Sequence, residues 1–152
     1  MDGKAVYNTL IKMLDAKEWN YKRHDEDLVI TTGVRGEDLP MDIILRVLTK
    51  LEVVQFISTL PFKMPEDKLV EGAIAVCTAN HRMINGSFDY DLSDGEIRFR
   101  MASGYSGCEI SEDMLYRMLM VGASTVDHYN DKFFMISKGM LSIKDFIEQE
   151  MN

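Results

Sequence analysis

Residues 85–101 read NGSFDYDLSDGEIRFRM, and this segment decides the fold class. On both sides of Asp94-Gly95, apolar residues alternate with polar ones, which is the period of a half-buried β-strand. Asp-Gly is a preferred pair for the two-residue type I′ turn, in which Gly95 takes a positive φ. The segment therefore predicts an antiparallel hairpin that turns at Asp94-Gly95. The expected cross-strand pairs are Leu92 with Ile97, Tyr90 with Phe99, Asp91 with Arg98 and Asp89 with Arg100.

The remainder of the chain predicts further helices and strands around this hairpin. Apolar residues at helical spacing locate the helices, and β-branched runs locate the strands. The expected class is α+β: a single antiparallel sheet flanked by helices in the order α-β-β-β-α-β-β-α, forming one domain over residues 1–152. The helices are expected to begin at Asp2, Pro65 and Ser111, with a short last helix capped by Ser142. Strands are expected at 28–34, 41–48 and 53–60, with a short one near Tyr21.

Proline, glycine and apolar spacing predict the element boundaries and the buried faces. Pro61 and Pro65 are expected to end the third long strand, because proline cannot donate to a sheet ladder. The helix after Pro65 is expected to close at Asn85-Gly86. Its core-facing stripe is expected to be Leu69, Ala73, Cys77 and Ile84, and that of the long helix after Ser111 to be Leu115, Leu119, Val126 and Phe133.

The composition limits the classes of partner and the compartment. The 17 basic and 25 acidic residues give a net charge of −8, which repels nucleic acids and anionic membranes. No apolar run is long enough to span a membrane, and the N-terminus does not have the pattern of a secretion signal. Cys77 and Cys108 do not have the spacing of a metal site. We expect a cytoplasmic protein that binds neither nucleic acid nor membrane.

Three motifs resemble catalytic or metal sites, and each fails on its spacing. Ser106 follows a strand as a hydrolase nucleophile would, but Cys108 occupies the position that requires glycine. Asp89, Asp91 and Asp94 resemble a calcium loop whose third acid comes one residue too late. The histidines at positions 24, 81 and 128 have no partner at metal-binding spacing. The sequence therefore predicts no catalytic, cofactor-binding or metal-binding residues.

Methionine is the residue type that stands above background, with 12 copies. Met is unbranched and adaptable, and it is over-used on surfaces that accept varied partners. Met114, Met118 and Val121 lie beside the stripe that the long helix is expected to turn toward the sheet. These three residues are the candidate surface for a homodimer or a protein partner.

Several segments resemble the bacterial YbjN-like family, which has the type III secretion chaperone-like fold. They are residues 36–41 (GEDLPM), the helix ending in Ala79-Asn80, residues 85–91 (NGSFDYD) and residues 94–100 (DGEIRFR). The resemblance implies a homodimer without enzymatic activity or cofactor. Secretion chaperones hold segments of partner proteins, and YbjN-like proteins have been associated with sensory regulation, so the resemblance also implies a protein partner.

Two functional hypotheses from different classes remain open. The first is a non-catalytic protein-binding module of the chaperone or adaptor type, which captures a segment at a sheet edge or at the methionine-bearing helix surface. The second is a regulator that binds a small ligand in a pocket lined by Tyr90, Phe99 and Phe134. An enzyme of unrecognised type is the least favoured alternative.

Overall fold

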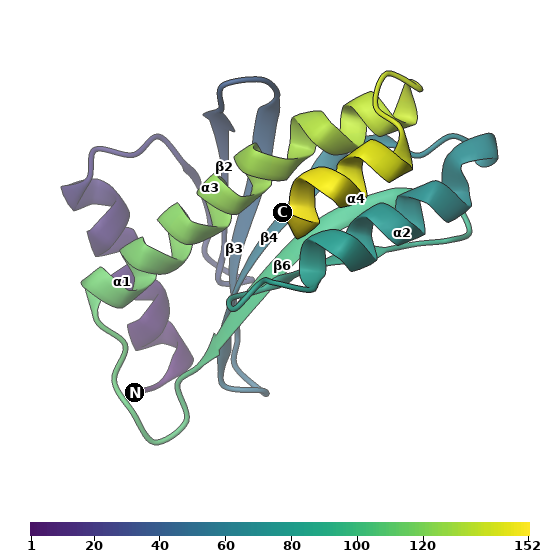
Figure 1. Cartoon of the computed structure of the whole chain (residues 1–152). Helices are drawn as coiled ribbons and strands as arrows, with labels where there is room; N and C mark the ends of the chain where they lie inside the picture. The colour runs from purple at the N-terminus through teal and green to yellow at the C-terminus, as the bar shows by residue number, and fades with distance from the viewer.

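The computed structural model describes all residues from 1 to 152 and shows one antiparallel sheet with helices packed on one of its faces (Figure 1). The α+β class is confirmed, and the expected order of elements is present with two short additions, the strand β1 before the three long strands and the helix α4 after α3. The sheet has six strands in the order β1-β2-β3-β4-β6-β5. The helices are α1 (Gly3–Ala16), α2 (Leu69–Asn80), α3 (Glu112–Ser137) and α4 (Ile143–Met151), and the strands are β1 (Lys22–His24), β2 (Val29–Arg35), β3 (Pro40–Leu48), β4 (Val53–Lys63), β5 (Ser87–Tyr90) and β6 (Glu96–Gly104).

The core lies between the sheet and the helices. Alternate residues of β3 are buried, and the residues between them point to the open face, where Ile44 is 39% exposed. Helix α3 comes close to β4 at Gly122, where a Cβ atom would lie only 2.7 Å from the ring of Phe56. The expected stripe of α3 is buried, which confirms that this helix packs on the sheet; its members are Leu115, Leu119, Val126 and Phe133.

Side chains satisfy the free backbone N–H groups at three helix starts, as the sequence suggests. Asp2 accepts the N–H of Ala5 at 2.8 Å and so caps α1. Ser111 and Ser142 cap α3 and α4 in the same way. Caps of this kind stabilise a helix by about 1 kcal/mol, and here they fix where each helix begins. None of the helices is long and apolar enough to cross a membrane.

The β5–β6 hairpin forms as expected, but its turn type and its register differ from the prediction. The N–H of Asp91 donates to the carbonyl of Glu96 at 3.0 Å and extends the pairing by one residue beyond β5. The loop therefore contains four residues, from Leu92 to Gly95, and the predicted two-residue type I′ turn at Asp94-Gly95 is wrong. Tyr90 pairs with Ile97 instead of Phe99, a shift of two residues. A shift of two keeps each strand residue on its predicted face, because side chains alternate with a period of two.

Local hydrogen bonds of Asp91 explain the longer loop. Its carboxylate accepts the backbone N–H and the hydroxyl of Ser93, at 2.8 and 2.6 Å. Its carbonyl accepts the N–H of Gly95 at 2.7 Å, and Gly95 has a φ of +78°. Aspartate side chains commonly bond the backbone two residues on, and this bond competes with strand pairing. Leu92 is therefore left in the loop, 60% exposed, rather than opposite Ile97.

Pro61 lies inside β4, so the prediction that it ends this strand is wrong. The pairing of β3 with β4 reaches only Ile57, and the pairing of β4 with β6 is irregular between Thr59 and Lys63. Proline is tolerated in a strand where no regular ladder bond is required from its nitrogen.

Helix α2 ends at Asn80, well before the predicted closure at Asn85-Gly86. The side chain of Asn80 accepts the N–H of Phe88 at 2.8 Å and donates to its carbonyl at 2.9 Å, which ties the helix end to β5. The predicted apolar stripe is also wrong, because Cys77 and Ile84 are exposed. Mostly small side chains form the buried face and bring α2 close to the sheet: Gly72, Ala75, Val76 and Ala79.

Candidate functional site

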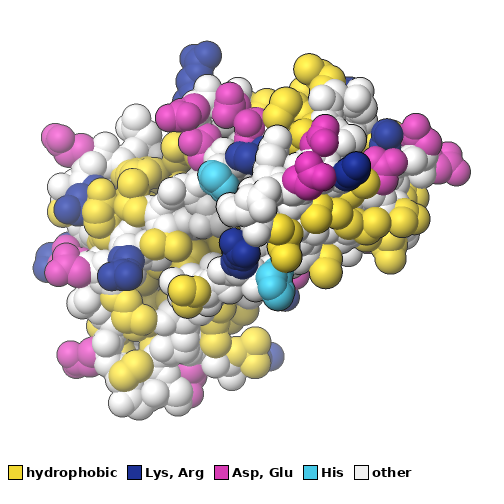
Figure 2. All heavy atoms as spheres, in the orientation of Figure 1, with side chains coloured by type: hydrophobic (Ala, Val, Ile, Leu, Met, Phe, Trp, Pro, Cys, Tyr) yellow, Lys and Arg dark blue, Asp and Glu magenta, His cyan; other side chains and the backbone are white.

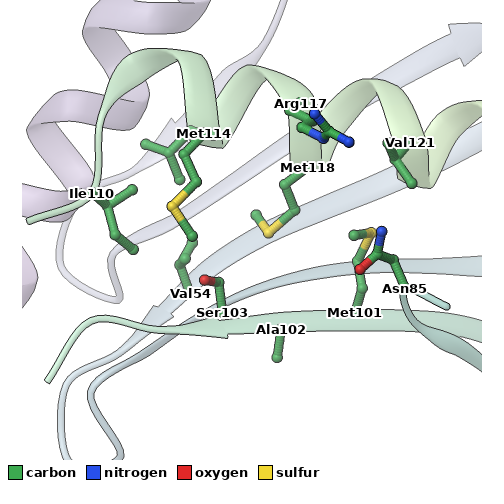
Figure 3. Close-up of a pocket in the computed structure, with 11 residues that line it drawn as sticks. Val54, Asn85, Met101, Ala102, Ser103, Ile110, Met114, Arg117, Met118 and Val121 are labelled. Carbon is green, nitrogen blue, oxygen red and sulfur yellow. The ribbon is translucent and has the colours of Figure 1, made fainter. Parts of the chain in front are cut away.

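The three residues singled out on α3 lie in one groove between this helix and β6 (Figure 3). Met114, Met118 and Val121 come from successive turns of the helix and line a cavity of about 160 Å³. Met101 lines the opposite wall, and Ile110 lies at the end nearest the start of α3. Eight of the 11 lining residues are hydrophobic, so the groove suits apolar side chains.

The two methionines of the helix have different accessibility. Met114 is 44% exposed at the mouth of the groove, whereas Met118 is only 7% exposed and points down toward the sheet. Met118 is therefore not a surface residue, and the sequence pattern placed it too far outward. Met118 follows Leu115 by one helical turn, so its side chain lies over β6 and is covered by the wall of the groove.

The groove lies beside a strand edge that no other strand covers. β5 pairs with β6 only from Ile97 to Arg100. β6 continues to Gly104, and over these last residues its only neighbour is β4. An uncovered edge presents free backbone N–H and C=O groups, which can pair with a further extended chain. The apolar groove and the open edge of β6 therefore meet at Met101, Ala102 and Ser103.

Few polar groups line the groove. Arg117 lies at its rim, exposed to solvent and without an ion pair, and Asn85 and Ser103 face the cavity from the sheet side (Figure 3). Fixed polar groups are what a small-ligand site uses to orient its ligand, and such pockets usually measure about 300–1,000 Å³. A cavity of about 160 Å³ is better matched to a few apolar side chains.

The aromatic residues proposed to line a ligand pocket are not brought together. Phe99 is fully buried and contacts Phe56 and Phe88 edge to face. Phe134 packs against Phe62 with ring centroids 5.3 Å apart. The hydroxyl of Tyr90 donates to the carbonyl of Leu69 at 2.6 Å. Each of the three therefore stabilises a different contact of the core.

The motifs that resembled catalytic or metal sites also lie apart from one another. Ser106 and Cys108 are exposed in the connection between β6 and α3. Asp89 forms ion pairs with Arg98 and Arg100 on the open face of the sheet. No group of three His, Cys, Asp or Glu side chains is close enough together to hold a metal ion.

Solved structures with a similar fold include chains from two protein complexes, one of them a chaperone-effector complex. A chain in the crystal structure of the ExsC-ExsE complex gives a TM-score of 0.60 at 12% identity, covering 86% of this chain and 96% of that one. A chain in the structure of the HopA1-SchA chaperone-effector complex gives 0.56 at 14% identity, covering 84% and 95%. The crystal structure of YbjN, a putative transcription regulator from E. coli, gives 0.59 at 8% identity, covering 80% and 86%. At these identities the likeness shows the fold alone, and it confirms the chaperone-like fold.

No curated protein matches the chain by sequence. A family model does match, over residues 7–135, a range that includes all of the strands and every residue that lines the groove. The chain therefore belongs to the YbjN family, which is described as a putative bacterial sensory transduction regulator.

Proposed function

We propose that this protein is a non-catalytic protein-binding module of the adaptor or chaperone type. In this proposal an extended segment of a partner protein pairs with the open edge of β6 and inserts apolar side chains under α3. The observation that carries the proposal is the continuation of β6 beyond Arg100, where β5 stops, directly beside the methionine groove.

Strand addition supplies both affinity and selectivity. Main-chain hydrogen bonds along the edge hold any extended segment, and a pocket that accepts alternate side chains selects among sequences. Flexible Met114 and Met118 adjust to side chains of different shape, which suits a module with more than one partner. The chaperone-effector complex among the structural neighbours and the regulatory description of the family support a protein partner.

A photo-crosslinking residue placed in the groove tests the proposal in the native cell. A crosslinker at position 114 is expected to capture an apolar segment of another protein. A crosslinker at position 120 is the matched control, because Met120 is 41% exposed on the same helix, outside the groove, and Met114 is 44% exposed. Equal capture at both positions would contradict the groove assignment.

A charge in the groove then measures its contribution to affinity. Met114→Glu is expected to weaken binding of the captured segment about tenfold, because burying an unpaired carboxylate opposes docking. Met120→Glu introduces the same charge on the same helix and is expected to leave the affinity unchanged. The outcome that contradicts the proposal is a Met114→Glu protein that binds as tightly as the parent. A Met114 adduct that contains only a second copy of this chain would assign the groove to self-association instead.

The homodimer stays a prediction, and the outer face of α2 supports it better than Met118 does. Val70 is 70% exposed and Ile74 is 40% exposed, one turn apart, with Cys77 exposed on the next turn. Figure 2 shows apolar side chains gathered over this part of the molecule, at the right of the view. We propose that this face contacts its own copy, and light scattering of the parent and of Ile74→Glu at dilute concentration tests it. A monomeric parent would exclude the dimer.

A further inference from the structure

A second cavity, far more polar than the groove, lies at the N-terminal end of α1, which the N label marks in Figure 1. Its volume is about 600 Å³. Three separate loops and helix ends form its walls: the start of α1, the loop between β1 and β2, and the loop between β3 and β4. Tyr105, the first residue after β6, closes it.

The walls of this cavity carry an excess of negative charge. Four carboxylates line it, those of Asp2, Glu26, Asp27 and Glu52, against a single cation, Lys4. None of the four carboxylates forms an ion pair within the chain. The carboxylate of Asp2 accepts the N–H of Ala5 and so offsets the positive end of α1. The remaining three have no hydrogen-bond partner.

A buried hydroxyl without a partner lies against the same cavity. Tyr105 is 1% exposed, and its hydroxyl makes no hydrogen bond. This hydroxyl lies 2.9 Å from the position that a Cβ atom on Gly3 would take, so it reaches the start of α1. Burial, followed by the charges of Glu52 and Asp2, raises the pKa of the Tyr105 hydroxyl, so the group stays protonated and neutral at pH 7. A buried polar group without a partner costs about 1–3 kcal/mol, which a ligand atom can recover.

The spacing of the carboxylates indicates the class of ligand. They are too far apart for any three of them to hold a metal ion. A larger cation with several N–H groups can bond each carboxylate separately, and charge-assisted bonds of this kind are the strong ones. We propose that this cavity binds an extended organic cation that carries two or more amino or guanidino groups. The same chemistry is found in a free polyamine and in the lysine and arginine side chains of a protein segment.

The backbone at Glu52 takes an uncommon conformation at the wall of this cavity. Glu52 has a φ of +52°, and its carbonyl accepts the N–H of Tyr105 at 2.8 Å. Leu28, on the neighbouring loop, has a φ of +54° and also lines the cavity. The two walls thus contain two of the three non-glycine residues with positive φ, the third being Glu18. Glu52 and Tyr105 are therefore the residues whose substitution tests the site most directly.

Calorimetric titration of the full chain with two probes distinguishes the two sources of cation. The probes are spermidine and an acetylated Arg-Gly-Arg tripeptide, each at low ionic strength because salt screens exposed charges. Saturable binding below about 5 mM is expected for at least one of them. Tighter binding of spermidine assigns the site to a free polyamine, and tighter binding of the tripeptide assigns it to protein side chains. Failure of both probes to saturate would overturn the proposal.

Matched variants distinguish binding of the cationic probes in this cavity from the general attraction of an acidic protein for cations. Glu52→Gln is expected to weaken binding about fivefold, whereas Glu148→Gln, an equal change of charge on the exposed surface of α4, is expected to change it less than about twofold. Equal weakening by both would overturn the proposal. Tyr105→Phe is expected to weaken binding about threefold without lowering the melting temperature, because the lost hydroxyl has no partner in the fold. Unchanged affinity in Tyr105→Phe would also overturn it, because the hydroxyl is what distinguishes this cavity from an ordinary acidic surface.

Discussion

The loops of the β3–β4 and β5–β6 hairpins have the same length and end in the same backbone conformation, but with very different residues. Each has four residues, Thr49 to Glu52 in one and Leu92 to Gly95 in the other, and each joins antiparallel strands. The last residue of each loop has a positive φ, +52° for Glu52 and +78° for Gly95. One hairpin uses glycine at this position, and the other uses glutamate.

The surroundings of the two positions explain why glycine is required at only one of them. A Cβ atom on Gly95 would collide with the backbone carbonyl oxygen of Met64, whose N–H donates to the carbonyl of Gly95 at 2.9 Å. Glu52 instead has space for its side chain, because it faces the acidic cavity at the start of α1. A left-handed conformation costs an L-residue about 1–2 kcal/mol. The chain therefore keeps a strained backbone with a carboxylate side chain at a position where a glycine would fit.

The loop between β1 and β2 is a third example, and there burial offsets the strain. Leu28 closes this loop with a φ of +54°. Its side chain is partly buried against the core, which compensates for the backbone cost in a way that an exposed carboxylate cannot. Of the two loop ends with a strained backbone, Leu28 and Glu52, only Glu52 therefore has a strain that no packing within the fold offsets.

Of the substitutions considered, one at Gly95 is expected to change the free energy of unfolding most. Gly95→Val is expected to lower the free energy of unfolding by about 3 kcal/mol, because a β-branched residue at positive φ adds strain and its Cβ meets the backbone of Met64. Gly107→Val is the control: Gly107 also has a positive φ, of +69°, but nothing lies within 4 Å of a Cβ there. Urea unfolding of both variants separates the steric contact with Met64, which only Gly95→Val makes, from the backbone strain that both variants share. Equal losses of unfolding free energy would mean that the contact with Met64 has no effect.

Substitution of Glu52 by glycine is expected to have an intermediate effect on the free energy of unfolding, and to raise it rather than lower it. Glu52→Gly removes about 1–2 kcal/mol of left-handed strain but adds about 0.4–1 kcal/mol of unfolded-chain entropy, so a net stabilisation of about 0.5–1 kcal/mol is expected. Glu52→Gln keeps the strain and is expected to leave the urea midpoint unchanged. The same Glu52→Gly protein is expected to bind the cationic probes more weakly, so its stability and affinity change in opposite directions. A destabilised Glu52→Gly protein would contradict the comparison of the two loops.

The sequence predicts the strands of these hairpins well and their loops poorly, and this difference has a physical reason. Strand and helix patterns repeat over many residues, so periodicity located the long helix α3 and the strands of the sheet. The loop of the β5–β6 hairpin instead depends on hydrogen bonds of one side chain, Asp91, which no period reveals. For the same reason the local effect of Asn80 on the end of α2 was not predicted.

The candidate site was predicted in part. The pattern on α3 identified Met114, Met118 and Val121, which do line one groove. The β6 side of the groove was missed, although the apolar alternation after Gly95 continues to Met101 and so hints at a longer second strand. The acidic cavity gave no signal, because its lining residues come from four segments that are far apart in the sequence and meet only when the sheet folds.

The smallest expected effect concerns Asp94, whose counterpart in the β3–β4 loop is Leu51. A side-chain hydrogen bond from Lys63, followed by a backbone hydrogen bond from Glu96, lowers the pKa of the Asp94 carboxyl below its ordinary value. A depressed folded-state pKa means that the stabilisation is fully present above the unfolded-state pKa, about 3.9, and is lost as the pH falls through the folded-state value. Asp94→Asn is therefore expected to lower the urea midpoint slightly at pH 7 and not at all at the acid end.

Two further variants assign this acid dependence to the β5–β6 hairpin. Lys63→Met is expected to remove most of it, because the lysine supplies the largest contribution to the shift, while the bond from the Glu96 N–H remains. Leu51→Ala changes the equivalent position of the other loop, where an exposed apolar side chain has no charge to titrate, and is expected to leave the pH profile of the parent intact. Urea midpoints measured from pH 7 down to about 3 give the profiles. An Asp94→Asn profile parallel to that of the parent over this range would mean that the Lys63 contact does not stabilise the folded hairpin, and the two loops would then differ only at their last residue.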